Sequence, residues 1–379
     1  MLSCNICYQN FEKDTDKEPK IMECGETLCL NCIKNIKKDK DHFTCPICQK
    51  DIYENIEDMP TNLYIFNPVK TILCDICSME YDNNYKSEKT PRILQCGHTF
   101  CSKCLKSKEN LDKGILCMFC GQFTKKKVED CRVNKIIIEK VEEEIISSMK
   151  YIEGNIDISK IDNQYSVGLM GETGGGKTSI NQFFRTGKPL DNSLATVGFN
   201  YEYKFIKCKK KTVKLSLIDT AGQEKFMSLS AGALRGVYGL LLVFSLTPLW
   251  QNNENYEKAD EATKKNLEEG YKLKVFQGLE FWLNQFKAFN TKENAIIYLI
   301  GNKVDDEEHR IIKYKDAKNF AKQYNLKYYE TSAKTGQNIN RVFFDLTYDL
   351  LKTFPNIIGK GSTIQLNNGK KNSGGGSCC

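Results

Sequence analysis

The sequence lacks the features that would carry a chain into or across a membrane. No run of about 18 consecutive apolar residues occurs anywhere in it. The chain opens on Cys4 and Cys7 rather than on a basic and then apolar leader. Neither a transmembrane helix nor a secretion signal is therefore expected, and the prediction by default is a cytoplasmic protein.

The sequence also lacks a concentrated basic surface. Its net charge of +7 arises after residue 150, because acidic and basic residues nearly balance before that point. The later basic residues are spread out and are not interleaved with aromatic ones, as they are in many nucleic-acid-binding faces. We expect an ordinary solvated surface and no nucleic-acid partner. The length of 379 residues allows two or three domains.

Cysteine, by contrast, is abundant and concentrated. Fourteen of the 18 cysteines precede residue 121, mostly in Cys-x-x-Cys pairs. Without an export signal, such pairs indicate metal binding rather than disulfides. Seven of them recur at an offset of 70 and then 72 residues: Cys4, Cys7, Cys24, Cys29, Cys32, Cys45 and Cys48 match Cys74, Cys77, Cys96, Cys101, Cys104, Cys117 and Cys120.

Each repeat is too small to hold a hydrophobic core of its own, so bound metal should contribute folding energy. Tetrahedral thiolate and imidazole ligands suit Zn²⁺. The second repeat adds His98 within Cys96-Gly-His98-Thr-Phe-Cys101, and its spacing closely resembles the RING finger family. That resemblance implies interleaved ligands: Cys74, Cys77, Cys101 and Cys104 for one zinc, and Cys96, His98, Cys117 and Cys120 for the other.

The first repeat departs from this pattern because Glu26 stands where His98 stands in the second. A carboxylate is a harder ligand than imidazole and suits zinc less well. We expect Cys24, Cys45 and Cys48 to bind a weaker zinc, completed by Glu26, by His42 or by water. The two repeats together should then hold about three to four Zn²⁺ ions.

The RING resemblance also implies a ubiquitin-conjugating enzyme and ubiquitin as partners. Such domains recruit the enzyme through an apolar residue in the first ligand pair, here Ile6 or Ile76, and a proline in the last pair, here Pro46. The second repeat lacks that proline, and no arginine follows Cys48 or Cys120 where active RINGs often place one. Both a ligase and a zinc-stabilised binding platform remain open.

A glycine-rich loop, Gly171-Glu-Thr-Gly-Gly-Gly-Lys-Thr178, follows an apolar run and precedes a helical pattern. Glycines allow backbone N–H groups to turn toward phosphate oxygens, while lysine adds a charge and threonine a hydroxyl for Mg²⁺. A plain glycine-rich turn is the alternative interpretation. The candidate nucleotide-binding residues of this loop are Gly171, Gly174, Gly175, Gly176, Lys177, Thr178 and Ser179.

From Tyr165 onward, apolar strands alternate with amphipathic helices. This alternation predicts an α/β domain with a six-stranded, mostly parallel sheet that carries its ligand at the carboxyl ends of the strands. The expected strands are 165–170, 199–208, 212–218, 239–245, 295–300 and 327–331. The expected helices lie near 177–186, 226–235, 275–289, 315–324 and 338–352.

Further polar motifs follow these strands. Asp219 can reach Mg²⁺ through water, the Gly222 N–H can meet a γ-phosphate, and Gln223 can orient the attacking water. In Asn302-Lys303-Val-Asp305, the carboxylate of Asp305 can accept hydrogen bonds from N1–H and the 2-amino group of guanine, so guanine is selected. The segment Thr331-Ser332-Ala333-Lys334 closes the base pocket from the last strand.

These motifs, in this order, resemble the Ras-superfamily GTPases and their Rab branch. The resemblance implies GTP and GDP as ligands, Thr178, Thr196 and Asp219 at Mg²⁺, and Lys177 and Gln223 in catalysis. It also implies an exchange factor, a GTPase-activating protein and effectors as partners. The sequence departs from Rabs at Ile218, Ala233-Leu234 and Ser245, which affects partner surfaces more than phosphate chemistry.

These patterns divide the chain into segments. We expect a first zinc module at 1–60, a second at 70–125, a helical linker at 128–160, a GTPase domain at 163–354 with an insertion near 248–274, and a flexible tail at 355–379. For residues 251–272 of the insertion we expect a solvated loop or a helical arm, and a dedicated partner site is the alternative interpretation. The chain closes on Cys378-Cys379, and in Rabs such a pair is doubly geranylgeranylated. Two lipid chains are what stable anchoring requires, so we expect membrane attachment on the cytosolic face of an endomembrane.

Overall fold

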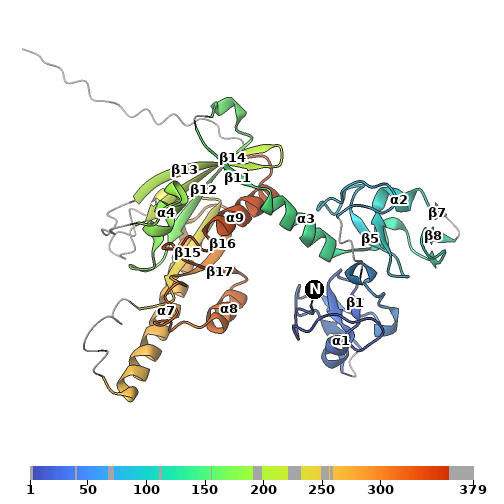
Figure 1. The fold of residues 1–379 in the computed structure, drawn as a ribbon, viewed down its shortest axis with the longest axis horizontal. Helices are drawn as coiled ribbons and strands as arrows, with labels where there is room; N and C mark the ends of the chain where they lie inside the picture. The colour runs from blue at the N-terminus through green and yellow to red at the C-terminus, as the bar shows by residue number, and fades with distance from the viewer. Residues whose placement is uncertain are drawn as a thin grey trace, which may run out of the picture. The chain divides into compact units, whose positions relative to one another are not determined.

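The computed structural model describes residues 3–38, 41–66, 72–110, 113–154, 156–190, 199–220, 232–248, 256 and 259–357 (Figure 1). The chain divides into two compact units, Met1–Ser147 and Ser148–Cys379. We call them the first and the second unit. No helix among the described residues is both long enough and apolar enough to cross a membrane.

The first unit contains the same small motif twice. A two-stranded hairpin leads into a short helix that begins just after a cysteine. A second antiparallel sheet follows, with two strands in the first copy and three in the second. The sulfur of Cys29 caps its helix by accepting a hydrogen bond from the Cys32 N–H at 3.4 Å, and Cys101 does the same for Cys104. The first copy contains β1 (Pro19–Ile21), β2 (Thr27–Cys29), α1 (Leu30–Lys37), β3 (Phe43–Thr44) and β4 (Asp51–Ile52). The second contains β5 (Pro91–Ile93), β6 (Thr99–Cys101), α2 (Ser102–Lys106), β7 (Glu109–Asn110), β8 (Gly114–Leu116) and β9 (Phe123–Thr124).

Each copy ends in a short segment that returns to its own first hairpin. In the first copy Thr61 bridges to Lys20, and in the second β10 (Arg132–Val133) pairs antiparallel with β5. The amphipathic helix expected near 128–150 is present as α3, but only over Lys135–Ser147. Its buried face carries Ile137, Ile138, Val141 and Ile145.

The second unit is built on a seven-stranded sheet in the order β11-β13-β14-β12-β15-β16-β17. Strands β12, β14, β15, β16 and β17 are parallel, whereas β13 is antiparallel to β14 and β11 is antiparallel to β13. The strands are β11 (Lys150–Ile152), β12 (Asn163–Met170), β13 (Phe199–Cys208), β14 (Lys211–Thr220), β15 (Gly239–Ser245), β16 (Ile296–Asn302) and β17 (Lys327–Thr331).

Helices cover both faces of this sheet. Leu240, Leu242 and Phe244 of β15 join one apolar cluster with α7 (Glu261–Phe289) and α8 (Tyr314–Gln323). The alternate residues of a strand point to the opposite face, where α4 (Lys177–Thr186) and α9 (Ile339–Thr353) contact each other, with the Phe184 and Phe343 rings 4.2 Å apart. This two-sided burial explains why β15 is buried along its whole length.

The structure corrects two expectations for this unit. All six expected strands are present, but β11 adds a seventh from the segment predicted to be a helical linker. Aromatic packing explains this strand, because the Tyr151 ring contacts Phe184 and Phe344 and lies 4.1 Å beneath the Lys204 ammonium.

The helix predicted from residue 275 begins instead at Glu261, where the carboxylate of Asp260 caps it by accepting from the Thr263 N–H at 2.7 Å. The helical arm is therefore the correct alternative for residues 261–272 of the insertion. The helix expected near 226–235 lies outside the described residues up to position 231.

Candidate functional site

The glycine-rich loop lies where the sequence predicts it, between β12 and α4. Gly176 caps α4 with a φ of 93°, a left-handed conformation that favours glycine. A side chain at Gly176 would also collide with the amide nitrogen of Asn302. The loop therefore ends at a helix N-terminus, and the backbone N–H groups of a first helical turn suit a phosphate anion.

Lys177 is almost completely buried beneath the loop. Its ammonium donates to the carbonyl oxygens of Gly171 and Glu172, both at 2.8 Å. Burial lowers the pKa of Lys177 to about 8, against the opposing attraction of Asp219 and Glu172. The charge is thus held at the loop and is less favourable there than in water, so a phosphate group would stabilise it.

Asp219 reaches the same region from the end of β14. Both carboxylate oxygens are buried, and neither has a hydrogen-bond partner among the described residues. Burial raises the pKa of Asp219, against smaller opposing effects of Thr178 and Lys177. Buried carboxylate oxygens without a partner, beside a threonine hydroxyl, are the oxygen donors that Mg²⁺ prefers. The residues present therefore fit the expected ion.

Asn302, at the end of β16, ties three segments together. Its amide nitrogen donates to the Gly175 carbonyl oxygen at 3.1 Å, and its oxygen accepts from the Thr331 hydroxyl at 3.2 Å and from the Ala333 N–H at 3.1 Å. Only 2% of Asn302 is exposed. The sequence places Thr331 in the segment that closes the base pocket, but it does not predict the hydrogen bond of Thr331 to Asn302.

The loops expected to hold the base lie beside this network. Asp305 is exposed, whereas Lys303 is partly buried in a left-handed conformation with a φ of 72°, and burial lowers the pKa of Lys303. Ser332 is fully buried, and its hydroxyl accepts from the Lys334 and Thr335 N–H groups at 3.2 and 3.0 Å. Asp305 is therefore accessible to a ligand. The turn at Ser332 fixes the backbone of Ala333 and Lys334.

Several expected site residues fall outside the described part of the chain. These residues are Thr196, Gly222 and Gln223 of the two switch segments and the terminal pair Cys378 and Cys379. Their roles stay predictions.

The structure brings the 14 cysteines of the two repeats, together with His98, into four clusters with the expected interleaving. In each cluster the candidate ligand atoms lie within 4.8 Å of one another. The Nδ1 atom of His98 lies 3.5 Å from the Cys96 sulfur and 3.6 Å from the Cys117 sulfur. Three clusters offer four ligands each: Cys4, Cys7, Cys29 and Cys32; Cys74, Cys77, Cys101 and Cys104; Cys96, His98, Cys117 and Cys120.

The fourth cluster contains Cys24, Cys45 and Cys48 alone among the described residues. The carboxylate of Glu26 instead accepts from the Lys135 ammonium at 2.6 Å, and the His42 ring stacks on Tyr53 with ring centroids 5.1 Å apart. The importance of Lys135 was not predicted from sequence. The repeat contains a signal for this contact. At the same offset of 72 residues, Lys135 of the second copy corresponds to Leu63 of the first, and His98 corresponds to Glu26, so both positions change between the copies.

Comparison with known families agrees with this arrangement. Residues 166–352 match the Ras family, residues 74–118 match a RING-type zinc finger, and residues 3–50 match a zinc-RING finger domain. GTP or GDP with Mg²⁺ and Zn²⁺ are therefore the ligands of this protein.

Individual relatives cover the second unit. Ras-related protein RABC1 of Arabidopsis thaliana is 31% identical over 213 residues, which span 56% of this chain and 87% of that protein. Ras-related protein RABC2b of the same plant is 28% identical over 222 residues, which span 58% of this chain and 96% of that protein. Ras-related protein Rab-26 of Bos taurus is 31% identical over 58% of this chain and 76% of its own length. The chain therefore belongs to the Ras family of GTPases, with Rab proteins among its relatives, and carries two RING-type zinc fingers ahead of its GTPase domain.

Proposed function

We propose that this protein is a membrane-anchored guanine-nucleotide switch whose phosphate and base sites are coupled through Asn302. The observation that carries the proposal is the buried carboxamide of Asn302, which bonds the phosphate loop at Gly175 and the base loop at Ala333. A nucleotide spans the space between those loops. One residue that fixes both loops sets the distance between the phosphate and base sites before the ligand arrives, which reduces the cost of binding.

Each group of the site then has a distinct role. Lys177 places its charge at the outer phosphates. Thr178 and Asp219 would hold Mg²⁺, which would supply positive charge to offset the charge of the transferred phosphoryl group. Asp305 selects guanine. Thr196 and Gly222 engage the γ-phosphate and so make the switch segments depend on which nucleotide is bound.

The pKa of Lys177 gives a test of phosphate binding. In the free protein this pKa is about 8, below its ordinary value of 10.5, and phosphate should raise it. Nucleotide binding should then take up about half a proton per site at pH 8 and little at pH 7, since Lys177 is already protonated there. Affinity for GDP should be nearly flat below about pH 7 and should fall progressively as the pH rises through 8.

Calorimetry of GDP binding at pH 8, in buffers with different ionisation enthalpies, measures this proton uptake directly. Lys177→Met should bind more weakly and lose the uptake. Binding of GDP by the unaltered chain without proton uptake would contradict the proposed role of Lys177.

Gln223 is proposed to align the attacking water. Gln223→Leu should lower the rate of GTP hydrolysis by at least about tenfold, because an apolar side chain cannot orient water, while affinity for GTP stays close to that of the unaltered protein. Single-turnover hydrolysis of preloaded GTP measures the rate. An unchanged rate would remove Gln223 from the mechanism.

A second activity, ubiquitin transfer, is favoured by one observation on the first RING module. Ile6 and Ile47 are 39% and 37% exposed although both are apolar. They adjoin cysteines of the first and the last ligand pair of the module, and Pro46 precedes Ile47. Exposed apolar side chains of this kind fit a protein partner. We propose that the first module recruits a ubiquitin-conjugating enzyme, whereas the alternative is a GTP-regulated scaffold whose RINGs bind other partners.

Ile6→Ala and Ile76→Ala form a matched pair for this proposal. In a reaction with activating and conjugating enzymes, ubiquitin and ATP, Ile6→Ala should reduce chain formation by about tenfold or more, as expected for a buried anchor at an interface. Ile76→Ala should reduce it less, because its module lacks the proline. Zinc content should be unchanged in both. Failure of the unaltered protein to form chains with any conjugating enzyme tested would favour the scaffold.

We also propose that the terminal Cys378 and Cys379 carry two prenyl groups. Two chains give stable membrane attachment, whereas one gives only marginal binding. The protein isolated from its own cells should show the mass of two geranylgeranyl groups and sediment with membranes. Cys378→Ser with Cys379→Ser should move it to the soluble fraction, and a native mass without either group would overturn this proposal.

A further inference from the structure

The two RING modules meet through reciprocal contacts between corresponding residues. Asn62 and Asn134, which are 72 positions apart, are both fully buried, and each amide donates to the other at 3.3 and 3.1 Å. Each also donates to a threonine of its own module, Thr27 or Thr99, at 3.1 and 3.0 Å. Because the contacts are reciprocal, any residue at the interface can be compared with its counterpart in the other module.

The backbone beside each fourth-ligand position lies against the other module. A Cβ atom built on Gly25 would lie 2.8 Å from the carbonyl oxygen of Val133, and one built on Gly97 would collide with the carbonyl oxygen of Thr61. Thr61 and Val133 correspond to each other, and both glycines are left-handed, with φ of 84° and 88°. Glu26 and His98, which follow these glycines, thus meet equivalent stretches of the opposite module.

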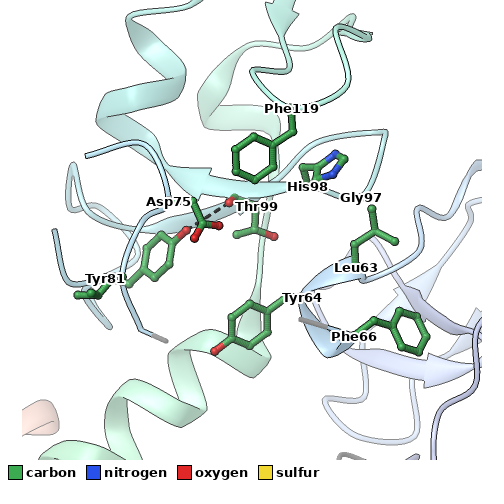
Figure 2. Close-up of a pocket in the computed structure, with 10 residues that line it drawn as sticks. Leu63, Tyr64, Phe66, Asp75, Tyr81, Gly97, His98, Thr99 and Phe119 are labelled. Atoms are coloured by element: carbon green, nitrogen blue, oxygen red, sulfur yellow. Dashed lines mark hydrogen bonds between the residues drawn. The ribbon is translucent and has the colours of Figure 1, made fainter. Parts of the chain in front are cut away.

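At this interface the modules differ at two positions that face each other. In the second module the ligand is His98, and the residue opposite is Leu63 of the first module. Leu63 would contact a side chain placed at Gly97. Leu63 and His98 also line the same cavity of about 270 Å³ (Figure 2). In the first module the counterparts are Glu26 and Lys135. Their carboxylate and ammonium lie 2.6 Å apart, with 10% and 21% of the two side chains exposed. Where the first module lacks the imidazole, the residue that faces it is therefore the cation Lys135 instead of an apolar leucine.

Electrostatics favours keeping Glu26 on Lys135 rather than on a metal. Zn²⁺ with three thiolates carries a net charge of −1, and a carboxylate would make it −2, whereas a neutral imidazole leaves it unchanged. Moving the carboxylate away would also leave the ammonium of Lys135 partly buried and unpaired, which is costly. Both effects act in the same direction.

We propose that Cys24, Cys45 and Cys48 form a three-thiolate zinc site whose fourth position is open to water or a small thiol, while Glu26 serves as the ion-pair partner of Lys135 that joins the two modules. Zinc in proteins is ordinarily four-coordinate, and a position not filled by protein takes an exogenous ligand. Cys24 and Cys48 are only partly buried, so such a ligand can approach. This proposal rests on the first unit alone and is independent of the nucleotide switch.

Zinc release from the full-length protein to a chromogenic chelator tests it. Three ions should be retained, and one should leave at least about tenfold faster, as expected for a site with one protein ligand fewer. Cys24→Ser should abolish the fast phase. Four ions that leave at one slow rate from the unaltered protein would overturn the proposal.

Two variants, Glu26→Gln and Lys135→Met, test whether Glu26 acts as a zinc ligand or as an ion-pair partner. Both break the ion pair, but only Glu26→Gln removes the carboxylate. Each should leave the fast release rate within about twofold of the unaltered protein, and their effects on the unfolding of the first unit should be strongly non-additive in the double variant. A rate that rises in Glu26→Gln but not in Lys135→Met would make Glu26 a zinc ligand.

The reverse experiment rebuilds the contact of the second module. Glu26→His with Lys135→Leu should slow the release of the fourth ion to the rate of the other three. In the Co²⁺-substituted protein, glutathione should alter the thiolate-to-metal absorption of the unaltered chain and leave that of this double variant unchanged. A fourth ion that stays labile in the double variant, or a spectrum of the unaltered chain that does not respond to glutathione, would count against an open position.

Discussion

The hydrogen bonds of the Asn302 carboxamide are the interaction on which the proposed nucleotide site depends. The side chain is buried at the end of β16, and its three bonds reach the phosphate loop, β17 and the turn that follows β17. A buried amide must satisfy its polar atoms internally, so the geometry of these segments is fixed together. Rotating or removing this one group would break the hydrogen bonds by which it joins the phosphate loop to the base loop. The parallel sheet places these segments at one edge, and Asn302 fixes the spacing between them.

The first unit has a different physical basis. Its two modules are small, and their apolar clusters include the cysteines themselves, such as Cys4, Cys29 and Cys45 in the first module. Metal binding and folding are therefore coupled in this unit. The pairing of the modules adds a second source of stability, because Asn62 and Asn134 bury their amides with every contact reciprocated. Two domains that are each marginal alone become one compact unit.

The comparison of the two copies shows how a repeat diverges without losing its interface. Residues that bond across the pair, Asn62 with Asn134, are the same in both copies, because changing one would leave the other buried and unsatisfied. Glu26 and Lys135 differ from His98 and Leu63, but they differ together and meet at one contact. Arg132 adds a further asymmetric contact, since its guanidinium donates to the Ile21 carbonyl oxygen at 2.8 Å and pairs with Glu54. The interface thus has a charge pattern that fits the first module against the second and that two copies of either module would not reproduce.

The sequence by itself determined the two zinc modules, the interleaving of their ligands, six of the seven strands of the large sheet and the phosphate loop. These features follow from local spacing: cysteine pairs at ligand distance, apolar runs of strand length, and glycines where a loop must approach phosphate. Only the tertiary structure decided the rest. Strand β11 forms because Tyr151 packs on Phe184 and Phe344, which lie 33 and 193 positions further along the chain, and Glu26 contacts Lys135 across 109 positions. Such contacts depend on which surfaces meet after folding, and neither periodicity nor motif spacing encodes that meeting.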